Sequence, residues 1–133
     1  MNFEKLNVWK ESVTLSSQVY IYFAQCRDFG FKDQITRSSL SVPSNISEGM
    51  VRESDKEKCH YINIALGSCA ELRTQIYVGL NINYIDDTQA QIWVKHTKYI
   101  AAMLIGLRKS IRGNMNTLKH SSHKALQRSI KRS

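Results

Sequence analysis

Apolar residues recur three and four positions apart along most of this chain, which is the spacing of one face of an α-helix. The 133 residues include a single proline and six glycines, too few for the many tight turns of a sheet protein. No stretch alternates apolar and polar residues as a half-buried strand does. The sequence therefore predicts the all-α class and a single core.

Two helices are predicted in the first 50 residues. The first covers about residues 4–26, and Gly30 follows it as a left-handed capping residue. The second begins near Lys32 and contains Pro43, where it either kinks or gives way to a new helix that has Pro43 in its first turn. A kinked, continuous helix is favoured because apolar residues keep to one side across Pro43: Ile35, Val42, Ile46 and Met50.

Two further helices complete an antiparallel up-and-down four-helix bundle. The third begins with a capping box of Ser54 and Glu57, and its apolar seam is Ile62, Ala65, Cys69, Leu72, Ile76 and Gly79. Residues 81–87 form the next loop, with Asp86, Asp87 or Thr88 as the N-cap of the fourth helix. That helix covers about 88–112 and ends at Gly113 and Asn114. The predicted bundle domain is 1–112, followed by a basic tail, 113–133. The sequence leaves open whether residues 114–133 are a frayed tail or an adaptable helix that orders on a partner.

The fourth helix has two opposite faces at about 100° per residue. Its predicted core face carries Ile92, Tyr99, Ile100, Met103, Leu104, Leu107 and Ile111. Its predicted basic face carries Lys95, Lys98, Arg108, Lys109 and Arg112.

Charge divides the chain unequally, although the total is +8. All eleven acidic residues lie at or before Asp87, and residues 88–133 carry ten lysines and arginines with no acid. The five cations of the tail are Lys119, Lys124, Arg128, Lys131 and Arg132. Ordinary solvent-facing helices interleave glutamate with lysine, so this asymmetry indicates a polyanionic partner.

The serine-rich segment around Pro43 has the composition of an active-site loop. A hydrolase at Ser44 and Glu48 would need a base within hydrogen-bond reach, but the nearest histidine in sequence, His60, lies beyond a helix start. The sequence has no nucleophile elbow, paired carboxylates or P-loop. We therefore expect no enzyme activity and no cofactor.

Three segments together resemble a known family. They are "LNVWKES" (6–12), "QITRSSLSVPSNISEG" (34–49) and "IALGSCAELRTQI" (64–76), with "NYID" (83–86) after them. In this order they are similar to the four-helix bundle proteins also called 23S rRNA intervening-sequence proteins, over residues 3 to about 110.

The resemblance implies an antiparallel bundle that assembles as a ring-like homopentamer. It also implies kinship with the accessory variability proteins of diversity-generating retroelements, which bind nucleic acid and a reverse transcriptase. It brings no catalytic residue. On this analogy the serine-rich segment around Pro43 is a structural signature that serves packing, capping or subunit contact. Its residues are Ser41, Pro43, Ser44, Asn45, Glu48 and Gly49.

Histidines and tryptophans are assigned structural roles. His96 is predicted to pack or to contact another subunit, and Trp9 and Trp93 to anchor the core or an interface. His120 and His123 could share a metal if helical, but without a third ligand we expect no metal site. Four apolar residues left over from the core would suit a subunit interface: Val78, Leu80, Val94 and Ile105.

Cellular location is inferred from what the sequence lacks. Residues 1–4 do not begin a secretory signal, and the longest apolar run is far short of the ~20 residues of a membrane span. Cys26, Cys59 and Cys69 are an odd number at unrelated spacings, expected as buried thiols. We therefore expect a cytoplasmic protein without a membrane role.

The main functional hypothesis is a non-enzymatic, homo-oligomeric protein that binds RNA or DNA backbones through the fourth helix and the tail. It would assist a nucleic-acid enzyme such as a reverse transcriptase. The alternative is a scaffold whose basic surface meets an acidic protein, with no nucleic-acid role.

Overall fold

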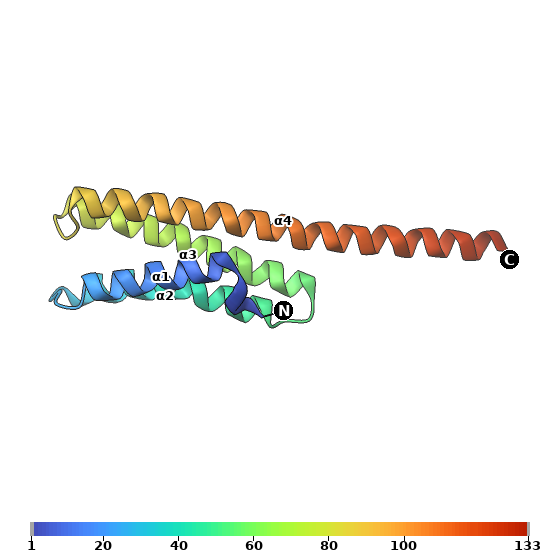
Figure 1. Ribbon diagram of the computed structural model, residues 1–133, viewed down its shortest axis with the longest axis horizontal. Coiled ribbons are helices and arrows are strands. Elements are labelled where there is room, and N and C mark those ends of the chain that lie inside the picture. Colours follow the sequence, from blue (N-terminus) through green and yellow to red (C-terminus); the bar gives the residue numbers. More distant parts are fainter. Residues whose placement is uncertain (1, 133) are drawn as a thin grey trace.

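The computed structural model describes residues 2–132, except for the side chains at positions 116–123, 125, 126, 129, 131 and 132. Within these residues the chain has no strand. A short 3-10 helix, η1 (Phe3–Lys5), precedes four α-helices: α1 (Asn7–Tyr22), α2 (Phe29–Met50), α3 (Asp55–Asn81) and α4 (Asp87–Arg132). Consecutive helices run antiparallel, so the α1–α2 and α3–α4 loops lie at one end of the bundle and the α2–α3 loop lies at the other (Figure 1). The predicted four-helix bundle is confirmed.

The α1–α2 connection differs from the prediction. Helix α1 ends at Tyr22, and Gly30 lies in the first turn of α2 rather than after α1. None of the described glycines has a positive φ, so the predicted left-handed cap at Gly30 is wrong. The reason is local: the Asp28 carboxylate accepts the Phe31 amide at 3.1 Å, which starts α2 earlier.

Helix α2 continues through Pro43 without a break, as the shared apolar side had indicated. At the start of α3, Ser54 Oγ accepts the Glu57 amide at 3.3 Å, as expected of the capping residue. At the start of α4, Asp86 Oδ1 accepts the Gln89 amide at 2.8 Å, so Asp86 is the N-cap.

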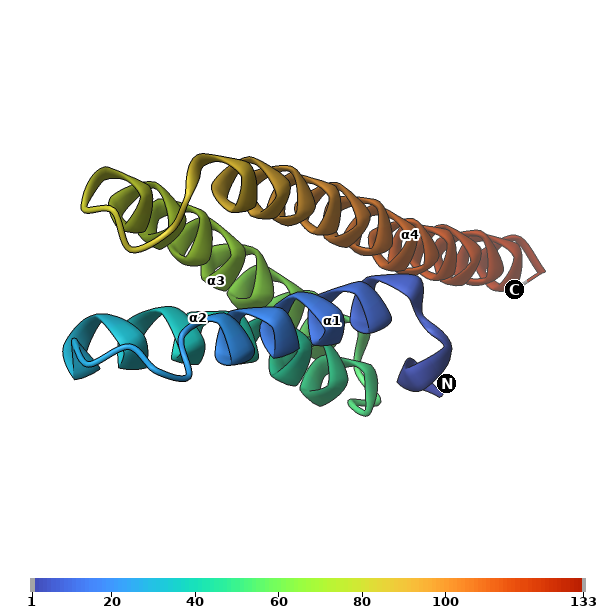
Figure 2. The same ribbon diagram turned by 60° about the vertical axis from the view of Figure 1, so that its left-hand side comes forward.

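Helix α4 does not end at Gly113. It runs for 46 residues, or about 69 Å at 1.5 Å per residue. A lone helical glycine costs only about 1 kcal/mol relative to alanine, and no proline follows it. The predicted helix end at Gly113 and Asn114 is therefore wrong. Figures 1 and 2 show α4 continuing past the ends of the other helices.

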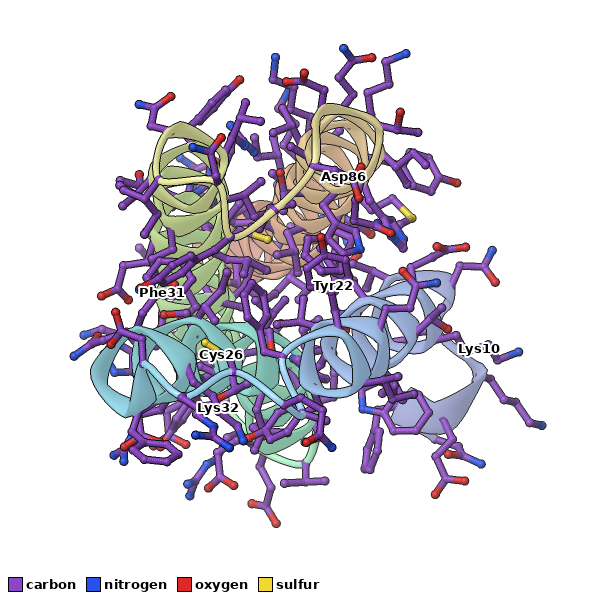
Figure 3. All side chains as sticks on the ribbon, turned by 90° about the vertical axis from the view of Figure 1, so that its left-hand side faces the viewer. Lys10, Tyr22, Cys26, Phe31, Lys32 and Asp86 are labelled. Carbon is purple, nitrogen blue, oxygen red and sulfur yellow. The ribbon has the colours of Figure 1, made fainter. Side chains whose placement is uncertain are left out.

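Side chains from all four helices fill the bundle (Figure 3). The predicted α3 seam is confirmed, because Ile62, Ala65, Cys69, Leu72 and Ile76 have no exposed surface and Gly79 is buried. The predicted core face of α4 is partly wrong, since Ile92 and Tyr99 are 53% and 55% exposed. The buried face of α4 instead carries Trp93, Thr97, Ile100, Leu104 and Ile111. A pattern of apolar residues does not reveal this face fully, because Thr97 is polar.

The bundle end that carries the α1–α2 and α3–α4 loops is joined by polar contacts. Tyr22 Oη donates to Asp86 Oδ2 at 3.4 Å and accepts the Asp86 amide at 3.3 Å (Figure 3). Tyr84 Oη donates to Asp28 Oδ2 at 2.9 Å. The hydrogen bond from the Phe31 amide lowers the pKa of the Asp28 carboxyl the most, and the hydrogen bond from Tyr84 lowers it further. These contacts fix the loop end, whereas α4 projects from the opposite end.

Candidate nucleic-acid interface

The serine-rich segment of α2 is a packing surface. Ser41 Oγ and Ser68 Oγ of α3 are 2.7 Å apart, and Asn45 Nδ2 donates to the Ser41 carbonyl at 2.8 Å. On the other side of α2, Ser39 Oγ lies 3.0 Å from Ser16 Oγ of α1. Short hydroxyl side chains thus let α2 approach both neighbours while their polar atoms stay bonded.

Gly49 permits a close approach between α2 and α3. A Cβ at this position would lie 2.8 Å from Tyr61 Cβ and 3.3 Å from the Lys58 carbonyl oxygen. Glu48 pairs with Arg52, whose guanidinium also donates to Tyr61 Oη at 3.0 Å and lies over the Tyr61 ring. Glu48 and Gly49 therefore take part in the α2–α3 contact.

The surroundings of Ser44 supply no base. Ser44 is exposed beside Pro43 in a shallow hollow of about 290 Å³. Among the described residues, this hollow is lined by apolar and hydroxyl side chains: Phe3, Trp9, Val13, Leu40, Pro43, Ser44 and Ser47. The nearby carboxylate, Glu48, is paired with Arg52. No histidine is among the described residues that line this hollow.

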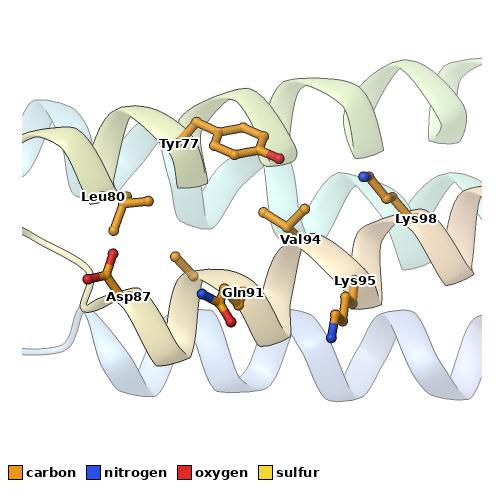
Figure 4. Close-up of a pocket in the computed structure, with 8 residues that line it drawn as sticks. Tyr77, Leu80, Asp87, Gln91, Val94, Lys95 and Lys98 are labelled. Carbon is orange, nitrogen blue, oxygen red and sulfur yellow. The ribbon is translucent and has the colours of Figure 1, made fainter.

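Lys95 and Lys98 lie on the outer side of α4, at a groove of about 260 Å³ between α3 and α4. Leu80, Ala90 and Val94 form its apolar part, and Tyr77 of α3 lies across from Val94 (Figure 4). Lys98 extends toward α3 in this view. Tyr77 was missed from the sequence because it lies outside the α3 seam.

Arg108 departs from the predicted basic face. Its Nη1 donates to Asn63 Oδ1 of α3 at 2.8 Å, and its side chain is half-buried. Arg108 therefore holds α4 against α3, although the sequence grouped it with Lys109 and Arg112. Both of these are exposed.

The basic surface continues along α4 beyond the bundle. Lys124 and Arg128 are exposed, whereas the side chains of Lys119, Lys131 and Arg132 lie outside the described residues. Among the side chains that the structure describes, no lysine or arginine of α4 forms an ion pair. The described cations of this surface are Lys95, Lys98, Lys109, Arg112, Lys124 and Arg128.

His96 joins α4 to α1. Its Nε2 lies 2.6 Å from Glu11 Oε2, so the histidine packs within the chain, as the sequence had indicated. Trp93 is a fully buried core residue whose Nε1 donates to Gln18 of α1 at 3.3 Å. Trp9 is only half-buried and stacks edge-on with Phe3.

Apolar side chains are exposed on the α1–α4 side of the bundle. Ile21 of α1 is 76% exposed, and Ile92 and Tyr99 of α4 are the two residues wrongly predicted in the core. Ile92 and Ile21 line a hollow of about 410 Å³ with neighbouring α1 and α4 residues. Of the four residues predicted to be left over from the core, Val78 and Ile105 are exposed, but Leu80 is half-buried and Val94 is buried.

The three cysteines are free thiols, of which Cys59 and Cys69 are buried and Cys26 is half-buried. Burial raises the pKa of the Cys69 thiol to about 11, against a smaller opposing effect of Arg73. Within the described residues no three metal-ligating side chains cluster. The side chains of His120 and His123 lie outside that description.

These features define a four-helix bundle protein with a closely packed α2–α3 contact and a long basic last helix. A model of the 23S rRNA-intervening sequence protein family matches residues 4–106, and the chain belongs to this family. A comparison with curated proteins gives no match.

A solved structure has the same fold. It is a protein of unknown function from the S23 ribosomal protein family of Bacteroides thetaiotaomicron, 24% identical to this chain, with a TM-score of 0.72. The match covers 77% of this chain and 98% of that one. None of the described helices is long and apolar enough to cross a bilayer.

Proposed function

We propose that this protein is a non-enzymatic, homo-oligomeric accessory protein that binds RNA or DNA backbones through α4. The observation that carries the proposal is the absence of ion-pair partners for the described lysines and arginines of α4. No acidic residue follows Asp87 in the sequence. Phosphates are the anions that such a surface fits best, because they neutralise many cations along one line.

The contacts are with phosphates rather than with bases along the bundle part of α4. Lys95, Lys98 and Lys109 are flexible point charges without a fixed hydrogen-bonding partner. Such contacts position a nucleic acid but carry little sequence information. Binding is therefore weakly sequence-specific and falls steeply with salt.

Self-association is part of the proposal. Ile21, Ile92 and Tyr99 expose large apolar side chains close to the α1–α4 seam, and a second copy covering them would remove this surface from water. The family resemblance gives five as the expected number of subunits, and sedimentation equilibrium measures it. A ring repeats the α4 cations around one axis and so strengthens their combined field.

We propose a reverse transcriptase as the partner enzyme, because the sequence resemblance implies kinship with the accessory variability proteins. A protein that holds template or primer by the backbone would raise its local concentration at such an enzyme without chemistry of its own. Co-purification with the enzyme, before and after nuclease treatment, separates a direct contact from one bridged by nucleic acid.

The test is a charge reversal with a matched control. The variant K95E/K98E/K109E changes the exposed α4 surface, and K5E/R27E/R37E changes net charge equally at exposed positions of η1, the α1–α2 loop and α2. Binding of a structured RNA and a random DNA duplex is measured at about 100 mM salt. We expect a loss of about tenfold or more for the α4 variant and a smaller loss for the control.

Equal losses in both variants would overturn the proposed surface, because only net charge would then matter. No binding by the wild-type chain at low salt would overturn nucleic-acid binding itself. The alternative of an acidic protein partner would then explain the α4 charge. The ratio of absorbance at 260 and 280 nm after low-salt purification gives an early indication.

A further inference from the structure

Helix α4 leaves the bundle after Ile111, which is the last core residue among the side chains that the structure describes. Residues 112–132, called the overhang below, continue as uninterrupted helix for about 30 Å. Figures 1 and 2 show no other helix beside the end of the overhang. The family match ends at residue 106, so the overhang is outside the part that this chain shares with its family.

The overhang is unsuited to two kinds of partner. It carries no acidic residue, so a second copy of it would meet it with like charge. No Phe, Tyr or Trp follows Tyr99, and single-stranded nucleic acid is usually held by bases stacked on such rings. Among nucleic acids, the overhang therefore fits a double strand, which can be bound without base stacking, better than a single strand.

Charged residues flank both sides of one line on this helix. At about 100° per residue, Lys109, Gly113 and Gln127 share a line to within about 40°. Arg112 lies about 60° to one side of Gln127, and Lys124 lies about 60° to the other side, with Arg128 beyond it at about 100°. Arg112, Lys124 and Arg128 are all exposed. Cationic side chains therefore extend from the helix on both sides of this line.

This arrangement matches a groove with phosphates on both walls. The major groove of B-form DNA is about 12 Å wide and admits an α-helix, whose diameter with side chains is about 10–12 Å. The major groove of A-form RNA is deep and too narrow to be read by side chains. A Cβ at Gly113 would meet nothing within 4 Å, and without a side chain there the groove floor can approach the helix closely.

We infer that the overhang docks in the major groove of double-stranded DNA, with Arg112 reaching one wall and Lys124 and Arg128 the other. This inference rests on the proposed nucleic-acid binding and narrows it to B-form duplex for this part of α4. The bundle part of α4 then contacts the same duplex through phosphates alone.

The experiment uses the full chain and a DNA duplex and an RNA duplex of one sequence. Dimethyl sulfate methylates guanine N7, which lies in the major groove, so protection of N7 reports occupation of that groove. The variant is K124Q/R128Q, and the matched control R27Q/R37Q removes the same charge from the opposite end and from α2. Circular dichroism checks that helix content is unchanged.

We expect N7 protection in DNA with wild-type and control proteins and its loss with K124Q/R128Q. We also expect DNA duplex to bind about tenfold or more tightly than the RNA duplex, and this preference to fall in K124Q/R128Q. Salt-sensitive binding without N7 protection, or equal binding of both duplexes, would overturn the groove inference and leave the proposed function standing. No binding of either duplex would overturn both.

Discussion

The α2–α3 contact and the outer surface of α4 use polar residues in opposite ways. Ser41 of α2 bonds to Ser68 of α3, and Arg52, in the α2–α3 loop, pairs with Glu48 and donates to Tyr61 of α3, so these polar side chains have partners within the chain. On α4, Lys95 and Lys109 are exposed and without an ion pair among the described side chains. Satisfied polar groups maintain the fold, whereas unsatisfied charges of one sign are available to a partner.

The serine-rich segment is the more unusual of the two in sequence, yet its polar side chains bond to neighbouring helices. The serines around Pro43 resemble the residues of an active-site loop, but their small side chains and Gly49 permit close helix packing. Each lysine of α4 is ordinary by itself, and what distinguishes the surface is the lack of acidic residues after Asp87 in the sequence. Changes in the first region should alter stability, and changes in the second should alter binding.

The largest loss of stability is expected in the α3 seam. Leu72 has no exposed surface, and its replacement by alanine leaves a cavity among packed helices. Leu72→Ala should lower the free energy of unfolding by about 2–5 kcal/mol, measured by denaturation in urea. A loss below about 1 kcal/mol would mean that the four helices are not packed around this residue.

Gly49→Ala tests how closely α2 and α3 pack. The added methyl group would lie 2.8 Å from Tyr61 Cβ, so α2 and α3 must move apart, at a cost of about 1–3 kcal/mol. Thermal unfolding measures the loss. If the variant were as stable as wild type, the close approach at Gly49 would be refuted.

Cys69 gives the bundle a dependence on alkaline pH. Its folded pKa of about 11 lies above its ordinary value of 9.0 because of burial. The protonated thiol contributes on the order of 2 kcal/mol to the free energy of unfolding. This contribution is complete below about pH 9 and is lost as the pH rises through 11. The free energy of unfolding should therefore fall more steeply between pH 9 and 11 in wild type than in Cys69→Ala. Parallel curves would show that the thiol ionises freely in the fold.

Gly113→Ala tests the overhang, and unlike the preceding substitutions it is expected to favour the folded helix. A Cβ at Gly113 meets nothing within 4 Å, and alanine favours helix over glycine by about 0.5–1 kcal/mol. Helix content by circular dichroism should stay equal or rise slightly. A fall in helix content would mean that the chain bends at Gly113 rather than continuing as helix.

Helix spacing in the sequence was enough to predict the all-α bundle, the α3 seam and the continuity of α2. The ends of helices were less predictable, because they depend on single hydrogen bonds such as that of Asp28 to Phe31. Gly30 and Gly113 both suggested ends, but neither has a left-handed backbone and both lie inside helices. A glycine permits a helix to stop but does not require it.

The candidate site was predictable in its charge but not in its geometry. The exposed positions of Lys95, Lys98, Lys109 and Arg112 agree with the predicted face, whereas Arg108 turns toward Asn63. A long side chain can reach either way from its position, so a helical wheel does not decide it.

Apolar surface was misjudged on α4 for a related reason. The wheel placed Ile92 and Tyr99 in the core because it counts hydrophobic residues without knowing where the neighbouring helices lie. Their exposure supports the proposed subunit contact, which sequence spacing alone could not distinguish from the core.

The most direct test of the central claim is a salt series with a DNA duplex, comparing the full chain with a variant that ends at Arg112. The variant keeps the core through Ile111 and loses Lys119, Lys124, Arg128, Lys131 and Arg132. Each lost phosphate contact should reduce the slope of log K against log salt by about 0.9. We expect a steep slope for the full chain and a slope shallower by up to about 4.5 for the variant. No binding by the full chain at low salt, or identical slopes for both proteins, would contradict it.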